Sequence, residues 1–569
     1  MDGAAAGRRD LVFRSHFASL PCEDLLMDTP HSKTIHTLTS VFLLGACAIG
    51  VILRLTRLTR ANVWTDEVFA LLRLSGTGLT QFVAELFHGK VVPTSQVLSY
   101  QSVGSRSTLA GIIASLRLEE IEQAPLFTIL THYAGSLGLS SVVAIRVVSA
   151  LASVATIALS GCLAYVLVRS SRAALIAAAL VACSPFQVLY AREGRCYALW
   201  VFLILLGTLM LDRATQENRF RDWVFYTCAC ILSLYTHPLT LLLLPGHALF
   251  IALRNCRIRG LLVPGSLSLG VAISAFVPWL MPTLLSWNHV VATDGRTAHS
   301  TAGHLVLVAH GLFSLLARSL AELLRYNDKW KLSQAYSMQV VLWVGLVVVV
   351  VTTVTLSMVV RRDRSRLAIL ILPTLSMIAG LVLIDLATGG DRSQCLRYFL
   401  PCITSFLVLT GIVVIEPEGE RPAPNRAARA LDTLQRILRR VQFPAILILF
   451  GLVSSIVQSS ATLNWLNGSV STEAAIADAL QASIQTGRLP TVRACQGNSM
   501  EVLILSHQLD PRVNWELTRE PCRLGLGDSM ATHVLSSNGF SEYPTAVQMR
   551  LRSQAIISSA DQRLQMARL

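Results

Sequence analysis

Apolar runs of about twenty residues recur along this chain from about residue 37 to about residue 460. A bilayer core of about 30 Å needs roughly 20 apolar residues per helix. The composition, 53% hydrophobic and 14% charged, is far from that of a soluble globular protein. The pattern predicts a polytopic membrane protein. Arg54, Arg57 and Arg60 follow the first run where a cleaved signal peptide would carry small residues, so we expect that run to remain as an anchor.

The net charge of +14 does not indicate nucleic-acid binding, because most basic residues lie in short loops between apolar runs. Short cytoplasmic loops collect Lys and Arg, so these loops predict the orientation of the chain in the membrane. Five basic connections are assigned to the cytoplasmic side: Arg169 with Arg172; Arg213, Arg219 and Arg221; Arg254, Arg257 and Arg259; Arg361, Arg362, Arg364 and Arg366; and residues 421–440.

This orientation predicts about eleven spanning helices with the amino terminus inside. We expect them near residues 37–55, 142–168, 173–190, 197–212, 223–236, 238–253, 261–281, 338–360, 367–387, 396–415 and 442–460. The predicted fold class is an all-α polytopic membrane protein with external juxtamembrane helices and a small C-terminal α/β soluble domain. The domains are a cytoplasmic tail (1–36), a membrane domain (37–460) with external loops at about 56–141 and 283–336, and a periplasmic domain (461–569).

Some external segments carry their own signals. Residues 125–139 are apolar but too short to cross comfortably, so we expect a juxtamembrane or re-entrant segment. Apolar residues within 79–87 and within 109–116 each fall on one helical face, which fits either interfacial helices or ordinary loop helices. In the last domain we expect a helix near 472–486 and a strand at 502–505. No C-x-x-C pair suggests a metal framework, but Cys495 and Cys522 could form a disulfide outside the cell.

Threaded in this way, the chain gathers polar residues on the external face. The set comprises Asp66, Glu67, Glu119, Glu120, Glu122, Arg192, Glu193, Arg195, Tyr235, His237, Asp391, Arg392, Arg397 and Tyr398. No step of the threading used these residues. Their convergence therefore indicates a functional surface beside the membrane.

The acidic pair Asp66-Glu67 has two compatible interpretations. It could occupy the first turn of an interfacial helix capped by Thr65, where negative charge favours the helix dipole. It could also act on a lipid-borne substrate, as a general base on an acceptor hydroxyl or as part of a divalent cation site.

Arg192, Arg195, Arg392 and Arg397 lie in external loops, where arginine opposes the orientation rule. Guanidinium groups form forked hydrogen bonds with phosphate oxygens, so a lipid phosphate would explain them. The alternative is that they are snorkelling anchors or ion-pair with Glu193 and Asp391. For His237 at a helix end, a structural hydrogen bond competes with a catalytic role.

Several short motifs occur in a specific order. They are Trp64-Thr65-Asp66-Glu67, Ala124-Pro125-Leu126-Phe127, Ser184-Pro185-Phe186, the stretch from Tyr190-Ala191-Arg192-Glu193-Gly194-Arg195-Cys196 to Tyr197-Ala198-Leu199, Tyr235-Thr236-His237, and Arg397-Tyr398-Phe399-Leu400-Pro401. In this order the chain resembles the multi-spanning C-type glycosyltransferases that use polyprenyl-phosphate sugars. It is similar to the lipid A aminoarabinose transferase and protein O-mannosyltransferase families, over roughly residues 40–255 and more weakly to about 415.

The resemblance implies that Asp66 is the catalytic base, supported by Glu67, and that the reaction inverts the anomeric carbon. It further implies that Arg397 stabilises the phosphate charge that grows in the transition state. The implied substrate-binding residues are Arg192, Glu193, Arg195, Tyr197, His237, Arg392, Arg397 and Tyr398. Many relatives have His-Pro-Pro or Glu-Lys-Pro where this chain has Gln123-Ala124-Pro125. A divalent metal ion at Asp66 therefore has only Glu122 as a substitute ligand.

We therefore expect a hexosyl- or pentosyltransferase of the cell inner membrane that acts on a cell-envelope glycan at the periplasmic face. Its partners would be a polyprenyl-phosphate sugar, a lipid, glycan or protein acceptor, and the bilayer, with no nucleic acid. A transporter or flippase of a lipid-linked or anionic solute is the alternative, but it would carry ionisable residues near mid-membrane and related halves. A glycan ligase is a second alternative, which would not need the acidic pair.

Overall fold

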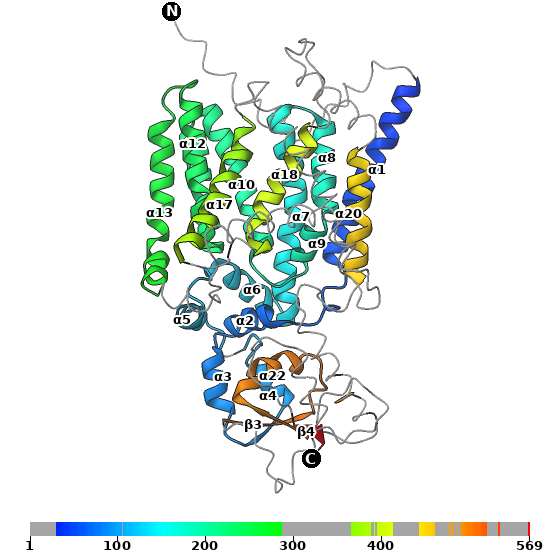
Figure 1. Cartoon of the computed structure of the whole chain (residues 1–569), viewed down its shortest axis with the longest axis vertical. Coiled ribbons are helices and arrows are strands. Elements are labelled where there is room, and N and C mark those ends of the chain that lie inside the picture. The colour runs from blue at the N-terminus through cyan, green and yellow to red at the C-terminus, as the bar shows by residue number, and fades with distance from the viewer. Residues whose placement is uncertain are drawn as a thin grey trace, which may run out of the picture.

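The computed structural model consists of a bundle of long helices with a smaller domain at one end (Figure 1). It describes residues 30–104, 106–286, 366–388, 392, 395–413, 443–460, 477, 480, 481, 485, 491–519, 533–534 and 567–568. The predicted span 338–360, nearly all of the predicted loop 283–336 and most of the predicted tail 1–36 lie outside these residues.

The first half of the described chain is helical except for one short strand. Its elements are α1 (Pro30–Leu55), α2 (Thr65–Leu74), α3 (Leu79–Leu86), β1 (Val91–Pro93), α4 (Thr94–Ser99), α5 (Leu109–Glu119), α6 (Leu126–Ser136), α7 (Ser141–Val168), α8 (Ser171–Cys183), α9 (Pro185–Ala191), α10 (Tyr197–Glu217), α11 (Phe220–Thr236), the 3-10 helix η2 (Pro238–Leu242), α12 (Leu244–Asn255) and α13 (Leu262–Leu285).

The second half of the described chain adds three apolar helices and most of a sheet. Its elements are α17 (Ala368–Thr388), η4 (Leu396–Phe399), α18 (Leu400–Val413), α20 (Phe443–Ser460), β2 (Thr491–Cys495), η5 (Gln496–Asn498), α22 (Ser499–Ser506), β3 (Asn514–Thr518), β4 (His533–Val534) and β5 (Ala567–Arg568).

Six described helical segments are long and apolar enough to cross a bilayer: Leu38–Leu55, Ser141–Val168, Tyr197–Glu217, Pro238–Asn255, Leu262–Leu285 and Ala368–Thr388. The bent pair α8 and α9 would make a seventh. The chain is therefore a multi-pass membrane protein, and its described residues contain fewer clear spans than the eleven predicted for the whole chain. Among the other predicted spans, α11 has 17 residues, and Arg397–Val413 and Pro444–Val457 are shorter apolar helices.

Pro185 causes the 60° bend between α8 and α9, because proline has no N–H to continue the helix. The carbonyls of Val181 and Ala182, which residues 185 and 186 would pair with in a continuous helix, instead accept hydrogen bonds from Arg54 at 2.9 and 2.7 Å. Ser455 donates to the next carbonyl, that of Cys183, at 2.9 Å. A buried arginine on α1 thus stabilises the break by satisfying backbone groups that lipid cannot.

The short apolar segment predicted at 125–139 forms the 11-residue helix α6, which is too short to span. Both amphipathic stretches are helical, but they pack differently. Ile112 and Leu116 of α5 belong to the core of the bundle, whereas Phe82 and Leu86 of α3 pack into the core of the smaller domain. Only α5 therefore fits the expected juxtamembrane position, and α3 is an ordinary loop helix.

The sheet of the smaller domain has the order β1-β3-β2-β4-β5, so its first strand comes from the loop after α1. β1 pairs antiparallel with β3, with Val92 opposite Trp515, and β2 runs parallel to β3, with Val492 opposite Trp515. Trp515 also donates from Nε1 to the Thr94 hydroxyl at 2.8 Å. Loop residues and C-terminal residues therefore share one core, rather than forming the separate C-terminal unit that we expected.

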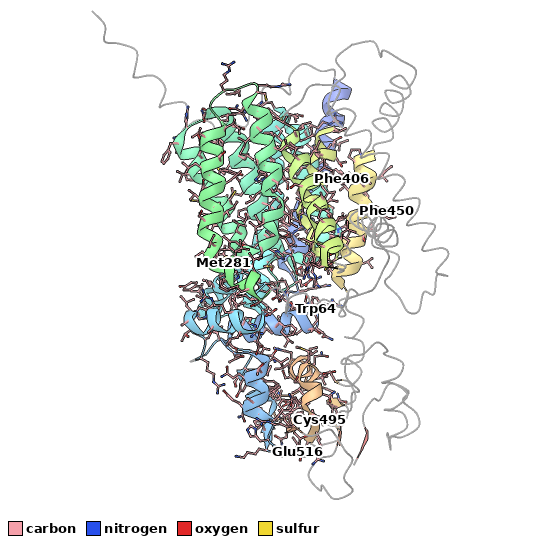
Figure 2. All side chains as sticks on the ribbon, turned by 60° about the vertical axis from the view of Figure 1, so that its left-hand side comes forward. Trp64, Met281, Phe406, Phe450, Cys495 and Glu516 are labelled. Carbon is pink, nitrogen blue, oxygen red and sulfur yellow. The ribbon has the colours of Figure 1, made fainter. Side chains whose placement is uncertain are left out.

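The strand predicted at 502–505 is wrong, because these residues lie in helix α22. A continuous apolar run of four buried residues has no periodicity that distinguishes a strand from a helix. Cys495 is disulfide-bonded, and Cys522, the partner considered from the sequence, lies outside the described residues. Figure 2 shows Cys495 and Glu516 in this smaller domain and Trp64 between it and the bundle.

Candidate functional site

Asp66 lies in the first turn of α2, at the boundary between the bundle and the smaller domain. Its carboxylate is 22% exposed and forms an ion pair with the guanidinium of Arg397, which η4 supplies from far along the chain. Trp64, not Thr65, is the N-cap of α2, and no side chain caps it, so the expected capping by Thr65 is wrong. The first turn thus presents Asp66 to a cation across the site.

Glu67, the next residue, is 1% exposed and fully engaged. Its two oxygens accept hydrogen bonds from Arg146 of α7 at 2.7 and 2.6 Å, and its Oε1 also accepts from the Gly194 amide at 2.8 Å. Arg146 donates further to the carbonyls of Leu58 and Ala61. Glu67 therefore fixes α2 against α7 and the loop after α9.

Arg195 lies behind Asp66 and is almost fully buried. Its Nη1 donates to the Asp66 backbone carbonyl at 3.0 Å and lies 3.8 Å from a carboxylate oxygen of Glu120. Burial opposes the charge of Arg195, but Asp66 and Glu120 outweigh it and raise its pKa. Arg195 is thus a fixed cation that orients the first turn of α2.

Aromatic rings form one side of the site. His237 stacks on Trp200 with ring centroids 4.5 Å apart, and contacts Tyr197 and Tyr398 at 5.8 Å each. The Arg397 guanidinium lies 5.9 Å from the Tyr197 ring centroid. Burial, with Arg195 and Arg397 nearby, lowers the pKa of His237 to about 3, and its Nδ1 accepts from the Leu239 amide. His237 is therefore neutral and has the structural hydrogen bond that we considered from the sequence.

Glu193 is 3% exposed, and neither carboxylate oxygen has a hydrogen-bond partner among the described residues. Burial, with Asp66 and then Glu67 nearby, raises its pKa to about 8. At neutral pH the side chain is thus mostly a neutral acid beside the charged Asp66–Arg397 pair.

The remaining predicted residues do not join this group. Arg192 points toward the loop after α1, where its Nη2 donates to the Arg57 carbonyl at 3.1 Å. The Arg392 amide donates to Asp385 at 3.0 Å, and Asp391 lies outside the described residues. Tyr235 donates to the Ala275 carbonyl at 2.8 Å. Of the four predicted phosphate-binding arginines, Arg195 and Arg397 therefore lie beside Asp66, whereas Arg192 points away from it.

The predicted metal ligands receive no support from the described part of the chain. Glu122 is exposed, and Asp66 is paired with Arg397. No group of three or more His, Cys, Asp or Glu side chains gathers within the described residues. Two carboxylates alone would be a sparse ligand set for a divalent ion.

Two functional arginines were missed from the sequence. Arg146 binds Glu67, and Arg73 is buried between Glu119 and Glu120 at 2.7 and 2.9 Å. The signal for Arg146 was present, because an arginine near the start of an apolar span is costly unless it has a partner. Arg73 carried a weaker signal, since it lies between Leu72 and Leu74 in a helix of only 10 residues that is too short to span a bilayer.

Comparison with known proteins agrees with this description. Residues 122–281, from just before α6 to the end of α13, match the family model "Dolichyl-phosphate-mannose-protein mannosyltransferase". No curated protein matches the chain significantly in sequence.

Among solved structures, the chain is similar to ArnT from Cupriavidus metallidurans bound to undecaprenyl phosphate, with 14% identity, 83% of this chain and 85% of that chain covered, and a TM-score of 0.48. It is also similar to AglB from Archaeoglobus fulgidus in complex with an inhibitory peptide and a dolichol-phosphate, with 14% identity, 85% and 65% coverage and a TM-score of 0.43. The family-model match confirms the expected resemblance to protein mannosyltransferases over residues 122–281.

Proposed function

We propose that the chain is an inverting glycosyltransferase of the cell inner membrane. It moves one sugar from a polyprenyl-phosphate carrier to an acceptor hydroxyl at the periplasmic face. The observation that carries the proposal is the pairing of a partly exposed carboxylate, Asp66, with a partly exposed guanidinium, Arg397, where the bundle meets its external domain.

The pair supplies both groups that the reaction needs. The acceptor oxygen attacks the anomeric carbon, the bond from that carbon to the phosphate oxygen breaks, and the acceptor proton passes to Asp66. Arg397 stabilises the negative charge that develops on the departing polyprenyl phosphate. Attack from the face opposite the leaving group inverts the configuration.

The ion pair also links donor binding to activation of the base. In the free protein the Arg397 guanidinium is engaged by Asp66. A donor phosphate would compete for this guanidinium, because carboxylate and phosphate oxygens both accept forked, charge-assisted hydrogen bonds from arginine. Once Arg397 turns to the phosphate, the Asp66 carboxylate is available to the acceptor hydroxyl.

The neighbouring residues fit a site for a neutral sugar beside a charged phosphate. The rings of Tyr197, His237 and Tyr398 lie near Arg397, and sugars present apolar C–H faces to aromatic rings. The neutral His237 can exchange hydrogen bonds with sugar hydroxyls without adding charge.

The external side is inferred from charge. The basic connections near Arg213, Arg221 and Arg257 lie at the end of the bundle opposite to Asp66. Positive loops stay in the cytoplasm, so the site faces the periplasm. The disulfide at Cys495 agrees, since an oxidising compartment permits it.

The test uses a deletion strain of the producing organism, complemented with wild type, Asp66→Asn or the control Asp510→Asn. Asp510 is a carboxylate in the external domain that pairs with exposed Arg512. With Asp66→Asn we expect one sugar to be missing from an envelope product and its polyprenyl carrier to accumulate, by mass spectrometry, at unchanged membrane abundance. Asp510→Asn should restore the product. Full restoration by Asp66→Asn would contradict the mechanism.

A further inference from the structure

Three arginines lie together outside the Asp66–Arg397 site, and we call Arg57, Arg60 and Arg192 the outer arginine cluster. The Arg192 Nη2 donates to the Arg57 carbonyl at 3.1 Å, which fixes its guanidinium beside the loop after α1. Burial, together with the nearby positive charges of Arg146, Arg57 and Arg60, lowers the pKa of Arg192 to about 10.

The outer arginine cluster has no carboxylate partner among the described residues. Arg146, Arg195 and Arg397 each face Glu67, Glu120 or Asp66, whereas no described acidic side chain forms an ion pair with Arg57, Arg60 or Arg192. Like charges held together without a counter-charge oppose the folded state. An anionic ligand would remove this opposition, and guanidinium forks match the oxygens of phosphate.

The backbone supports the same arrangement. Arg57 has φ 56°, in the left-handed region that non-glycine residues rarely adopt. In this conformation its carbonyl accepts from Arg192 while its own side chain is exposed. The strained backbone of Arg57 thus exposes its own guanidinium and fixes that of Arg192. Such strain is typical of binding sites.

The position of the cluster identifies the source of the phosphate. Arg57 and Arg60 directly follow the candidate span Leu38–Leu55, and Arg192 is bonded to Arg57, so the cluster lies at the depth of lipid headgroups. Ile49, Ile52 and Leu55 lie three residues apart on one face of α1 and are 38%, 55% and 42% exposed. The exposed apolar stripe of α1 therefore ends next to the arginines. A bound lipid could place its acyl chain along the stripe and its headgroup at the arginines.

We propose that the outer arginine cluster binds the phosphate of an anionic bilayer lipid, with acyl chains against the Ile49–Leu55 stripe of α1. This site is separate from the proposed donor site at Arg397 and does not depend on transferase activity. The lipid would neutralise the cluster and fix the loop that carries Leu58 and Ala61, the carbonyls of which bind Arg146.

The test compares lipid retention by the purified full-length chain, measured by native mass spectrometry in detergent with added phosphatidylglycerol or phosphatidylcholine. Wild type should retain phosphatidylglycerol selectively. Arg57→Gln/Arg60→Gln/Arg192→Gln should bind it about tenfold or more weakly, since each basic residue near the headgroups contributes to binding. A matched variant at the opposite end, Arg172→Gln/Arg219→Gln/Arg259→Gln, loses the same charge and should behave as wild type.

Further variants separate the alternatives. Arg60→Gln alone breaks no hydrogen bond within the described residues and should weaken retention by a few fold in a folded protein. Equal retention by the wild type and the triple variant would overturn the proposal. So would inorganic phosphate that displaces the lipid at equal concentration, because the stripe would then contribute nothing. A polyprenyl phosphate that displaces phosphatidylglycerol one for one would assign the cluster to the donor instead.

Discussion

Asp66 and Glu67 are adjacent acids with opposite surroundings. Glu67 is buried and receives hydrogen bonds from Arg146 and the Gly194 amide, whereas Asp66 is partly exposed and faces Arg397. A buried ion pair is costly to break, while a partly exposed one contributes little to stability. Two acids of nearly the same chemistry therefore differ in role because they point in different directions from one helical turn. Glu67 has the structural role, and Asp66 has the chemical one.

The largest effect should come from the buried side. Glu67→Gln leaves the Arg146 charge buried without its partner, so we expect a loss of about 3–5 kcal/mol in the free energy of unfolding. Unfolding in detergent by heat or denaturant measures it. Glu217→Gln, which removes an exposed ion pair with Arg219, is the control and should cost less than about 1 kcal/mol. Similar losses for the two variants would break the comparison.

The partly exposed side should respond in activity instead. Arg397→Gln removes the charge that stabilises the leaving phosphate, and we expect transfer to fall about 10²–10³-fold. Stability should change by less than about 1 kcal/mol, because the Arg397 side chain is 28% exposed. Initial rates with a radiolabelled lipid-linked donor, beside a melting curve, measure the two. Wild-type transfer with a collapsed melting temperature would mean that Arg397 is structural.

Glu193 predicts a pH dependence of stability. Its pKa in the folded protein is raised to about 8 from 4.5, so the folded state favours the protonated form. Stability is therefore fully present below about pH 4.5 and is lost as the pH rises toward 8, by at most about 1.4 kcal/mol per pH unit. Glu193→Gln cannot ionise, so its advantage over the wild type should grow from pH 5 to pH 8, reaching about 1–3 kcal/mol.

Melting temperatures at pH 5, 6, 7 and 8 measure this difference. Glu217→Gln should give a constant offset over the same range, because it removes only an exposed ion pair with Arg219. A constant offset for Glu193→Gln as well would mean that Glu193 is charged in the folded protein.

Glu119 and Glu120 extend the comparison to a second adjacent pair. Glu119 accepts from Arg73 and from the amides of Leu79 and Thr80 at the start of α3, whereas Glu120 lies between Arg73 and Arg195. Glu119→Gln keeps part of these contacts, so we expect the smallest effect, about 1 kcal/mol. Proteolysis between α2 and α5 should quicken, and transfer activity should stay near wild type. A large loss of activity would place Glu119 at the site.

Much of the membrane architecture could be predicted, because a bilayer requires long apolar helices. Each such helix is recognised from its own residues, without knowledge of what it packs against. The length of the apolar segment likewise predicted that α6 is too short to span.

The pairing of Asp66 with Arg397 could not be predicted from the sequence. The two residues are 331 positions apart, and only the packed bundle brings η4 to α2. The motifs indicated that both residues matter, but not that they touch.

The smaller domain was the least predictable part. The strand β1 has only three residues, too few to show an alternating pattern in the sequence. It is recognised as a strand only because it pairs with β3. Residues 502–505 were assigned to a strand because a short buried apolar run fits both structures. The separation of Arg192 from Arg397 was also invisible, because the orientation rule places residues on one side of the membrane without saying which loop they meet.

The shared sheet sets an order for biosynthesis. The hydrogen bond between Thr94 and Trp515 joins residues 421 positions apart, so the partner of β1 leaves the ribosome on the order of half a minute later. Until then Phe82, Phe87 and Val92, which are buried in the finished domain, have no core to enter. The nascent chain therefore carries an unpaired strand edge and an uncovered apolar face through the insertion of every later span. A chaperone on the side of the membrane where this domain folds would have this interval in which to act.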